Sequence, residues 1–266
     1  MNTLILGLLA ETAVHPGCGR DAGIVDLPVS REGGNGIPVI FGSGVKGAFR
    51  DKASRSGLPD EGWKSLFGKQ DSAGTLLFSD ARLLLLPVRS LSGHARWATC
   101  PFLLERFVRD SRRAECPVDA TVPTVERGTA LASGTGQLFL EERLYRITGT
   151  MPADIITMLQ RLVMHKETAA RLESELVVLH NDDFAWFAQY GLPVNARNVL
   201  EENTKTSKNL WYEETLPADS IFYALIGERI SGAVAEFRSQ VAASPYVQMG
   251  GNETVGQGWF SLAAFA

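Results

Sequence analysis

Two patterns of hydrophobic and polar positions recur along this chain and predict a sheet packed with helices. Alternating or continuous apolar residues predict strands at 4–10, 75–88, 137–148, 175–180, 221–226, 246–249 and 259–265. The segment 75–88 could instead be a hairpin. Apolar residues repeated at three and four predict helices at 43–57, 97–113, 154–164, 182–190 and 232–241. We expect an α+β fold with the helices on one face of the sheet.

Local signals mark the ends of two of these helices. Ser43 is expected to cap the helix that begins there, and Asn181 to cap the helix at 182–190, because both residue types are favoured N-caps. Gly57, with Pro59 beyond it, is expected to end the first helix.

Three polar or glycine-rich segments interrupt the regular pattern. Residues 12–42 hold six glycines before Pro38, and loops of this length in a compact domain are usually functional or disordered. Residues 194–216 are polar between apolar flanks, which predicts a protruding hairpin with its tip near 204–208. A third, glycine-rich segment at 250–259 lies between two predicted strands. Because no tandem repeat or low-complexity linker occurs, we expect one domain with excursions.

Composition indicates a globular chain. Of 266 residues, 45% are hydrophobic and 21% are charged, and no apolar run approaches the length that spans a membrane. The N-terminus lacks a basic region before Leu4, so we interpret it as a strand and not a signal peptide. Three cysteines without CxxC spacing argue against a zinc site or disulfide framework and are typical of a reducing cytoplasm.

Net charge alone argues against a nucleic-acid partner. It is −4 at pH 7, whereas contacts with phosphates need local Lys and Arg. Residues 46–55, however, carry four cations against one acid. The charge balance therefore leaves the partner open.

The start of the helix at 43–57 is a candidate phosphate site. Gly42, Ser43 and Gly44 would let backbone N–H groups approach an anion at a helix N-terminus. Lys46 and Arg50 lie four residues apart on one helical face. A solvated basic helix after a Gly-rich turn fits the same spacing equally well.

Two loops offer further candidates. His15, Arg20, Asp21, Asp26 and Arg31 share the first long loop, where Asp26 interrupts an apolar stretch. A charge in such surroundings must be paired or coordinated, and the residues alone favour a turn cap before Pro28 or an ion pair with Arg31. In the C-terminal loop, glycines permit close approach to a ligand that Asn252 or Glu253 could orient. His94, His165 and His180 have no metal-ligand spacing.

Taken in order, these segments resemble one family. The chain is similar to the RAMP superfamily of CRISPR proteins, and specifically to the backbone subunit of the type III-B (Cmr) effector complex. The blocks that carry this resemblance are VHPGCG (14–19), IVDLPVSRE (24–32), GIPVIFGSGVKGAFRD (36–51), LLFSDARLLLLPVRS (76–90), NLWYEETLP (209–217) and QMGGNETVGQGWF (248–260).

The resemblance implies an RRM-like, ferredoxin-like core within a single domain, 1–266. That domain would contain the basic helix 43–57, an inserted region 88–150, a thumb hairpin 194–217 and the Gly-rich loop 249–259. It also implies a cytoplasmic ribonucleoprotein in antiviral defence. Copies would stack helically along a guide CRISPR RNA with other Cmr subunits, and the complex would cleave complementary single-stranded target RNA at regular intervals.

The resemblance also implies roles for particular residues. Asp26 would be the residue on which cutting depends, with His15 in the same loop region. We expect the 2′-hydroxyl to attack its own phosphate and give a cyclic phosphate. Asp26 would bind a divalent cation such as Mg²⁺ or Mn²⁺, act as a base or orient the ribose, and His15 would move a proton. The expected RNA-binding residues are Arg20, Arg31, Gly42, Ser43, Lys46, Arg50, Lys205, Lys208, Gly250, Gly251 and Asn252.

One departure from the family pattern concerns activity. Thr215 stands where the family carries a Tyr near the cutting site, which puts the efficiency of cleavage in question. Three alternatives stay open: a structural RNA-binding filament subunit without nuclease activity, a RAMP endoribonuclease that processes the guide precursor, and an unrelated small-molecule enzyme.

Overall fold

The fold is built around one large mixed sheet. The computed structural model describes residues 2–21, 23–57, 59–91 and 93–265. Its 12-stranded sheet has the order β15-β16-β1-β14-β6-β7-β11-β8-β10-β9, with β2 beside β6 and β5 beside β14. β1 (Thr3–Ala10) lies between β14 (Ile221–Glu228) and β16 (Trp259–Phe265) and runs antiparallel to both.

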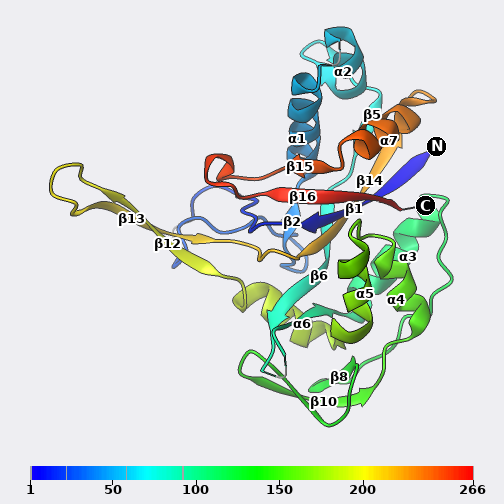
Figure 1. The fold of residues 1–266 in the computed structure, drawn as a ribbon, viewed down its shortest axis with the longest axis vertical. Helices are drawn as coiled ribbons and strands as arrows, with labels where there is room; N and C mark the ends of the chain where they lie inside the picture. Colours follow the sequence, from blue (N-terminus) through cyan, green and yellow to red (C-terminus); the bar gives the residue numbers. More distant parts are fainter. Residues whose placement is uncertain (1, 22, 58, 92, 266) are drawn as a thin grey trace.

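Helices cover both faces of this sheet, so the prediction of helices on one face is wrong. α1 (Gly42–Arg55) and α7 (Ala233–Ala243) lie on one side of β1 and β16, and α3 (Pro101–Arg113) lies on the other (Figure 1). All eight residues of β14 are buried. Because both faces of β14 are covered, its side chains do not alternate between buried apolar and exposed polar positions.

Aromatic side chains fill the two layers between sheet and helices. On one side Phe49 of α1 contacts Phe237 of α7 with ring centroids 5.0 Å apart. On the other, Phe107 of α3 packs against Tyr223 of β14 at 4.9 Å and Phe265 of β16 at 5.5 Å. These contacts join α1 to α7 on one side and fix α3 on β14 and β16 on the other.

The inserted region continues the same sheet. β7 (Ala95–Thr99) pairs with β6 (Ala81–Arg89), and β8 (Thr129–Ala132) follows further along the sheet. The strand predicted at 137–148 is two antiparallel strands, β9 (Gln137–Leu140) and β10 (Arg143–Gly149). The chain turns between them at Glu141, whose φ is +49°.

Three helices and one strand lie between this region and the hairpin. α4 (Ala153–Gln160) is shorter than predicted, and α5 (Lys166–Glu175) was missed. They are followed by β11 (Leu176–Leu179) and α6 (Asn181–Tyr190). The predicted Asn181 cap is wrong, because the His180 side chain accepts the N–H of Asp182, 3.2 Å away.

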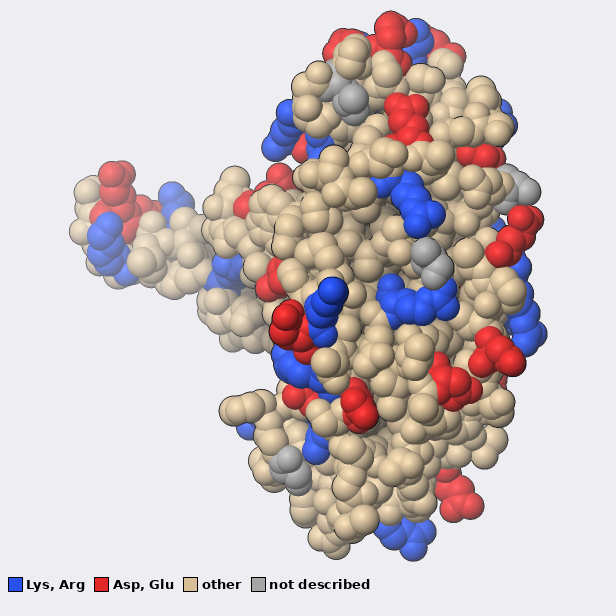
Figure 2. Space-filling view, turned by 45° about the vertical axis from the view of Figure 1, so that its right-hand side comes forward, with Lys and Arg blue, Asp and Glu red and all other residues tan. Residues whose placement is uncertain are grey.

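The polar segment after α6 forms a separate two-stranded hairpin. β12 (Val194–Leu200) pairs with β13 (Ser207–Glu214) in antiparallel register. The hairpin extends well away from the body (Figure 1), and basic and acidic side chains gather at its tip (Figure 2).

The remaining elements are short. The segment 75–88 is β5 (Leu76–Phe78) followed by β6, and both strands pair with β14, so they do not form a hairpin with each other. Helix α3 lies within the predicted segment 97–113 and begins at Pro101, because β7 occupies the residues before it. The other short elements are β2 (Val39–Ile40), α2 (Asp60–Phe67), β3 (Gly68–Lys69), β4 (Ser72–Ala73), β15 (Tyr246–Gln248) and η1 (Glu253–Val255). Within the described ranges, no helix is both long and apolar enough to cross a bilayer.

Candidate nucleic-acid interface and cutting site

The first long loop folds back on itself beside the root of the hairpin. Val14 forms a bridge with Leu216, and Gly17 with Val29. The Ser30 N–H also donates to the Pro16 carbonyl at 2.6 Å. Residues 17–29 therefore form an excursion whose two ends are held together, and this excursion carries Asp26.

Asp26 is bound to the hairpin and not to Arg31. Its Oδ2 accepts the Tyr212 N–H at 2.8 Å, and the next residue, Leu27, donates its N–H to the Tyr212 carbonyl at 3.1 Å. The side chain is half-buried. The ion pair with Arg31 that the sequence favoured does not form, because Arg31 has another acid.

That acid is Glu214, at the end of β13. Its Oε1 accepts from Nη2 of Arg31 at 2.7 Å, and its Oε2 accepts the Val29 N–H at 3.0 Å. Nη1 of Arg31 donates to the carbonyls of Gly36 and Ala188 at 2.9 and 2.6 Å. Arg31, expected to bind RNA, thus makes internal contacts that join the loop to β13 and α6.

His15 is buried at the same root. Its Nδ1 lies 2.7 Å from the backbone carbonyl oxygen of Glu214. Because a carbonyl oxygen can only accept, Nδ1 carries the hydrogen, and in the neutral ring Nε2 is the acceptor. A Cβ at Gly17 would lie 2.8 Å from Nε2, so only glycine fits beside that nitrogen.

The C-terminal glycine-rich loop lies against His15. The Gly251 N–H donates to the His15 carbonyl at 2.9 Å. At Gly250 φ is +94°, and a Cβ there would be 2.8 Å from the same carbonyl oxygen. The structure therefore brings together two loops that are more than 200 residues apart in the sequence.

Asn252 connects this loop to the hairpin. Its Nδ2 donates to the Glu213 carboxylate and, at 2.9 Å, to Oε1 of Gln257. Nη2 of Arg197, across the hairpin, lies 3.4 Å from the same oxygen of Glu213. The Asn252 amide is thus occupied within the protein, and its φ of +63° places the backbone in the left-handed region.

Helix α1 begins one residue earlier than predicted, and Ser43 does not cap it. The cap residue is Phe41, and the Gly42 N–H donates to Oδ1 of Asp80 at 2.7 Å. A Cβ at Gly42 would lie 2.8 Å from the Phe78 carbonyl oxygen, so close packing on β5 requires this glycine. A carboxylate distant in sequence therefore takes the role expected of Ser43, whose side chain is exposed.

The predicted cations of α1 lie on the flank away from the glycine-rich loop. The Arg50 guanidinium lies 5.5 Å from the centre of the Trp63 ring in α2. Lys46 is one helical turn before it and half-buried. The opposite flank of α1 carries Asp51, Lys52 and Arg55, which the RNA-binding prediction did not include.

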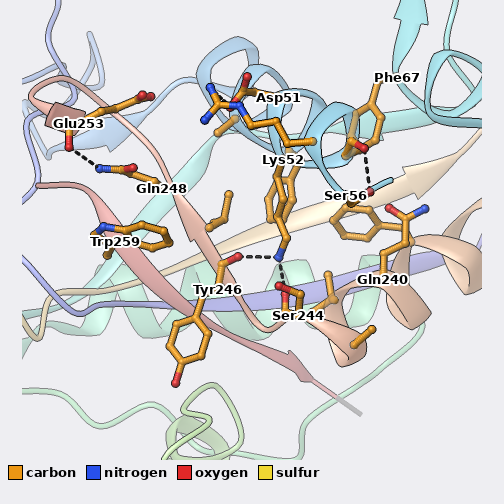
Figure 3. A pocket seen from close by; sticks show the side chains of 18 residues that line it. Asp51, Lys52, Ser56, Phe67, Gln240, Ser244, Tyr246, Gln248, Glu253 and Trp259 are labelled. Carbon is orange, nitrogen blue, oxygen red and sulfur yellow. Dashed lines mark hydrogen bonds and ion pairs between the residues drawn. The ribbon is translucent and has the colours of Figure 1, made fainter. Parts of the chain in front are cut away.

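That opposite flank lines a cavity of about 560 Å³ between α1, α7 and β15 (Figure 3). Lys52 reaches across it, and Nζ donates to the carbonyls of Ser244 and, at 2.5 Å, Tyr246. Burial lowers the pKa of the Lys52 ammonium. Glu253 and Trp259 form the side nearest the glycine-rich loop. The cavity therefore lies next to that loop, and neither Lys46 nor Arg50 is among the residues that line it.

The cations predicted on the loops and the hairpin tip are exposed. Arg20 lies in the Asp26 excursion, and Lys205 and Lys208 lie at the tip. Lys208 pairs with Glu201 at 3.3 Å, and both side chains are largely accessible to solvent. Such a pair contributes little energy, so Lys208 stays available to another anion.

The sequence prediction missed the two residues that organise the root. Glu213 and Glu214 were given no role of their own within the block NLWYEETLP, yet they are 3% and 7% exposed. Adjacent carboxylates in a strand point to opposite faces, and each one here binds a different loop. Their place directly before the apolar Leu216 was the available signal, because charges entering a core need partners.

Asp26 belongs to no cluster of metal-binding side chains among the described residues. No group of three or more His, Cys, Asp or Glu side chains that could hold a metal ion occurs in the part of the chain that the structure describes. The described residues alone therefore do not fit a self-contained metal centre.

Comparison with known proteins identifies the class. The RAMP superfamily pattern matches residues 8–261, so the chain belongs to the RAMP superfamily. It is 30% identical to the CRISPR system Cmr endoribonuclease Cmr4 of Pyrococcus furiosus over 282 residues, which cover 98% of this chain and 95% of the relative.

Solved structures agree with this assignment. Oligomeric Cmr4 from Pyrococcus furiosus superposes with a TM-score of 0.80 at 26% identity, covering 100% of this chain and 98% of that one. A chain of the type III-B Cmr-beta complex bound to cognate target RNA gives 0.80 at 20% identity, covering 100% and 98%, and that likeness shows the fold alone.

Proposed function

We propose that this chain is the backbone subunit of a type III-B CRISPR effector, and that it cuts target RNA at Asp26. Copies would stack along a guide CRISPR RNA together with other Cmr subunits. The observation that supports this most strongly is the meeting of Asp26, His15 and the glycine-rich loop at the hairpin root, within a chain so similar to Cmr4.

We interpret one part of the large sheet as an RRM-like core. Strands β16, β1, β14 and β6 are neighbours in that order, and α1 and α7 lie on the same side of them. A four-stranded sheet with two helices is the usual RNA-binding scaffold of this type. We interpret β12 and β13 as the thumb that displaces one nucleotide of the guide–target duplex.

Backbone groups of the loops and exposed cationic side chains would bind the RNA. Gly250 and Gly251 pack against His15 where a Cβ would be crowded, so these glycines would fix the shape of the loop that faces the RNA. Arg20, Lys205 and Lys208 are exposed and add positive charge along the loop and the hairpin. Gly42, Ser43 and Lys46 at the start of α1 would contact the guide backbone, whereas Arg31 and Asn252 would hold the surface in shape.

The cutting step would use the displaced nucleotide. Once its base is moved aside, the 2′-hydroxyl can line up with its own phosphate and the leaving 5′-oxygen. The 2′-oxygen forms a bond to phosphorus, the bond to the 5′-oxygen breaks, and a cyclic phosphate and a 5′-hydroxyl result. Nε2 of His15 would accept the proton of the 2′-hydroxyl, water would supply a proton to the leaving 5′-oxygen, and Asp26 would orient the ribose.

A divalent cation would need oxygen ligands from RNA in addition to Asp26. Mg²⁺ is commonly bound by one or two carboxylates together with phosphates of the substrate. We therefore expect cleavage to require millimolar Mg²⁺ or Mn²⁺ and to stop when EDTA is added. Cleavage that continues in EDTA would remove the cation from this proposal.

The decisive experiment is cleavage by the assembled complex. Purified complex should retain RNA of defined length and cut complementary RNA into a ladder of evenly spaced products. Asp26→Ala should abolish the ladder while the complex still assembles and binds target. An intact complex that binds target without cutting it, in the unaltered protein, would leave only the structural filament role.

A further inference from the structure

Glu214 directs every polar group it has toward the candidate cutting loop. Its N–H donates to the Leu27 carbonyl at 3.0 Å, and its own carbonyl accepts from Nδ1 of His15 at 2.7 Å. Its carboxylate accepts from the Val29 N–H and from Arg31. One residue of the hairpin thus contacts the loop on both sides of Asp26.

These contacts leave Asp26 little freedom. Leu27 follows it directly, and the Tyr212 N–H holds its carboxylate from two residues before Glu214. The neighbouring Glu213 faces the other way, toward Arg197 and Asn252. The two carboxylates therefore bind different loops at the root: Glu214 binds the loop that carries Asp26, and Glu213 binds the glycine-rich loop.

Burial makes the Glu214 contacts strong. A carboxylate that is only 7% exposed must be compensated, and here Arg31 and a backbone N–H supply the partners. Asp110 of α3 is equally buried and is paired with Arg82 and with the Tyr223 hydroxyl at 2.7 Å. Asp110 lies within the core, so it offers a comparison that involves stability alone.

We propose that Glu214 is a positioning residue for RNA cutting, which holds Asp26 and His15 in register with the hairpin when the hairpin engages RNA. This inference rests on the proposed function. It assigns no contact between Glu214 and the RNA. A displacement of a reacting group by about 1 Å is enough to cost about 100-fold in rate, so losing this anchor should slow cutting strongly.

The test is Glu214→Gln in the complete complex. Glutamine keeps the shape and can still accept the Val29 N–H, but it presents a neutral group to Arg31. We expect the single-turnover cleavage rate at saturating target to fall about 100-fold. The dissociation constant for target RNA and the spacing of the products should not change, because neither depends on the register of Asp26.

Two further variants separate positioning from stability. Asp110→Asn removes a buried charge of the same kind and should lower the melting temperature similarly while leaving cleavage unchanged. Arg31→Gln should reproduce the effect of Glu214→Gln, and the double variant should be no slower than the slower single one, because both remove the same ion pair. If Glu214→Gln cuts at the normal rate, or slows only as much as Asp110→Asn, Glu214 is structural and the inference fails.

Failure of the proposed function would look different. If Asp26→Ala cuts as the unaltered complex does, then Asp26 is not the cutting residue and both proposals fall together. If Asp26→Ala is inactive while Glu214→Gln is fully active, only the positioning role is overturned.

Discussion

The root and the tip of the hairpin carry the same kinds of charged side chains but use them in opposite ways. At the root, Glu213 and Glu214 are buried and bonded to loops from distant parts of the chain. At the tip, Glu201, Glu202 and Lys208 are exposed, and their ion pairing is weak. The root therefore determines geometry, whereas the tip can contribute only affinity.

The strongest way to disturb the root is to add a single methyl group to its glycine-rich loop. Gly250→Ala would place a Cβ 2.8 Å from the His15 carbonyl oxygen, in backbone that has a φ of +94°. Cleavage and guide binding should both fall at least tenfold. The measurement is guide retention and target cleavage by complexes assembled from the variant.

Gly256→Ala is the matched control for this change. Its φ is +82°, but nothing lies within 4 Å of the added Cβ. Both variants carry left-handed strain of about 1–2 kcal/mol, and only the first also clashes. Equal losses in the two variants would mean that strain, and not the contact with His15, controls this loop.

Substitutions at the tip should have smaller and uniform effects. Lys205→Gln and Lys208→Gln should each weaken RNA binding without regard to sequence and reduce the salt dependence of log Kd by about 1. The spacing of the cleavage products should remain the same. Lys166→Gln on α5, also exposed, serves as a control that should leave binding unchanged. A shifted cleavage pattern in either tip variant would contradict the assignment of affinity alone to the tip.

Chemical labelling of the cysteines probes the surroundings of the hairpin root with the least disturbance, because it needs no substitution. Cys18 is exposed in the Asp26 excursion, and its Sγ lies 3.5 Å from the Pro28 carbonyl oxygen. Burial raises the pKa of the Cys100 thiol from 9.0 to about 12. At pH 8 a thiol reagent should modify Cys18 rapidly and Cys100 only after unfolding, as mass spectrometry of the digested protein would reveal. Bound RNA should protect Cys18, and unchanged labelling would place the RNA elsewhere.

The same burial has a consequence for stability at high pH. The unfolded chain loses the Cys100 proton from about pH 9, whereas the folded chain keeps it until about pH 12. The contribution of this group to the free energy of unfolding is therefore complete below pH 9 and is lost as the pH rises toward 12. Denaturant titrations at pH 8 and pH 10 should show the lower stability at pH 10.

The sequence predicted those parts of the molecule whose cause is local. β1, β14 and β16 follow from apolar runs, and the body of α1 follows from Val45 and Phe49 at helical spacing. The cap of α1 could not be predicted in this way, because Asp80 lies between β5 and β6, 38 residues further along the chain than Gly42.

Prediction of the site failed for the same physical reason. The loop around Asp26 was recognised, but the expected role of its carboxylate was local, as a turn cap before Pro28 or a partner of Arg31, whereas the carboxylate accepts from the distant Tyr212 N–H. The partners of Glu213 and Glu214 lie far from them in sequence, and helical spacing could not tell which flank of α1 faces the glycine-rich loop. These arrangements are products of the tertiary fold.

The continuity of the sheet through β6 limits how this protein can be shortened. β6 is paired with β14 on one side and with β7 on the other, and its Leu83–Leu86 run is fully buried. A deletion of residues 88–150 would strip β11, whose four apolar residues are all buried, of β7 on one side and β8 on the other, and would leave its N–H and C=O groups unpaired. Such an edge recruits strands from other molecules, so the trimmed protein should precipitate instead of yielding a minimal RNA-binding unit.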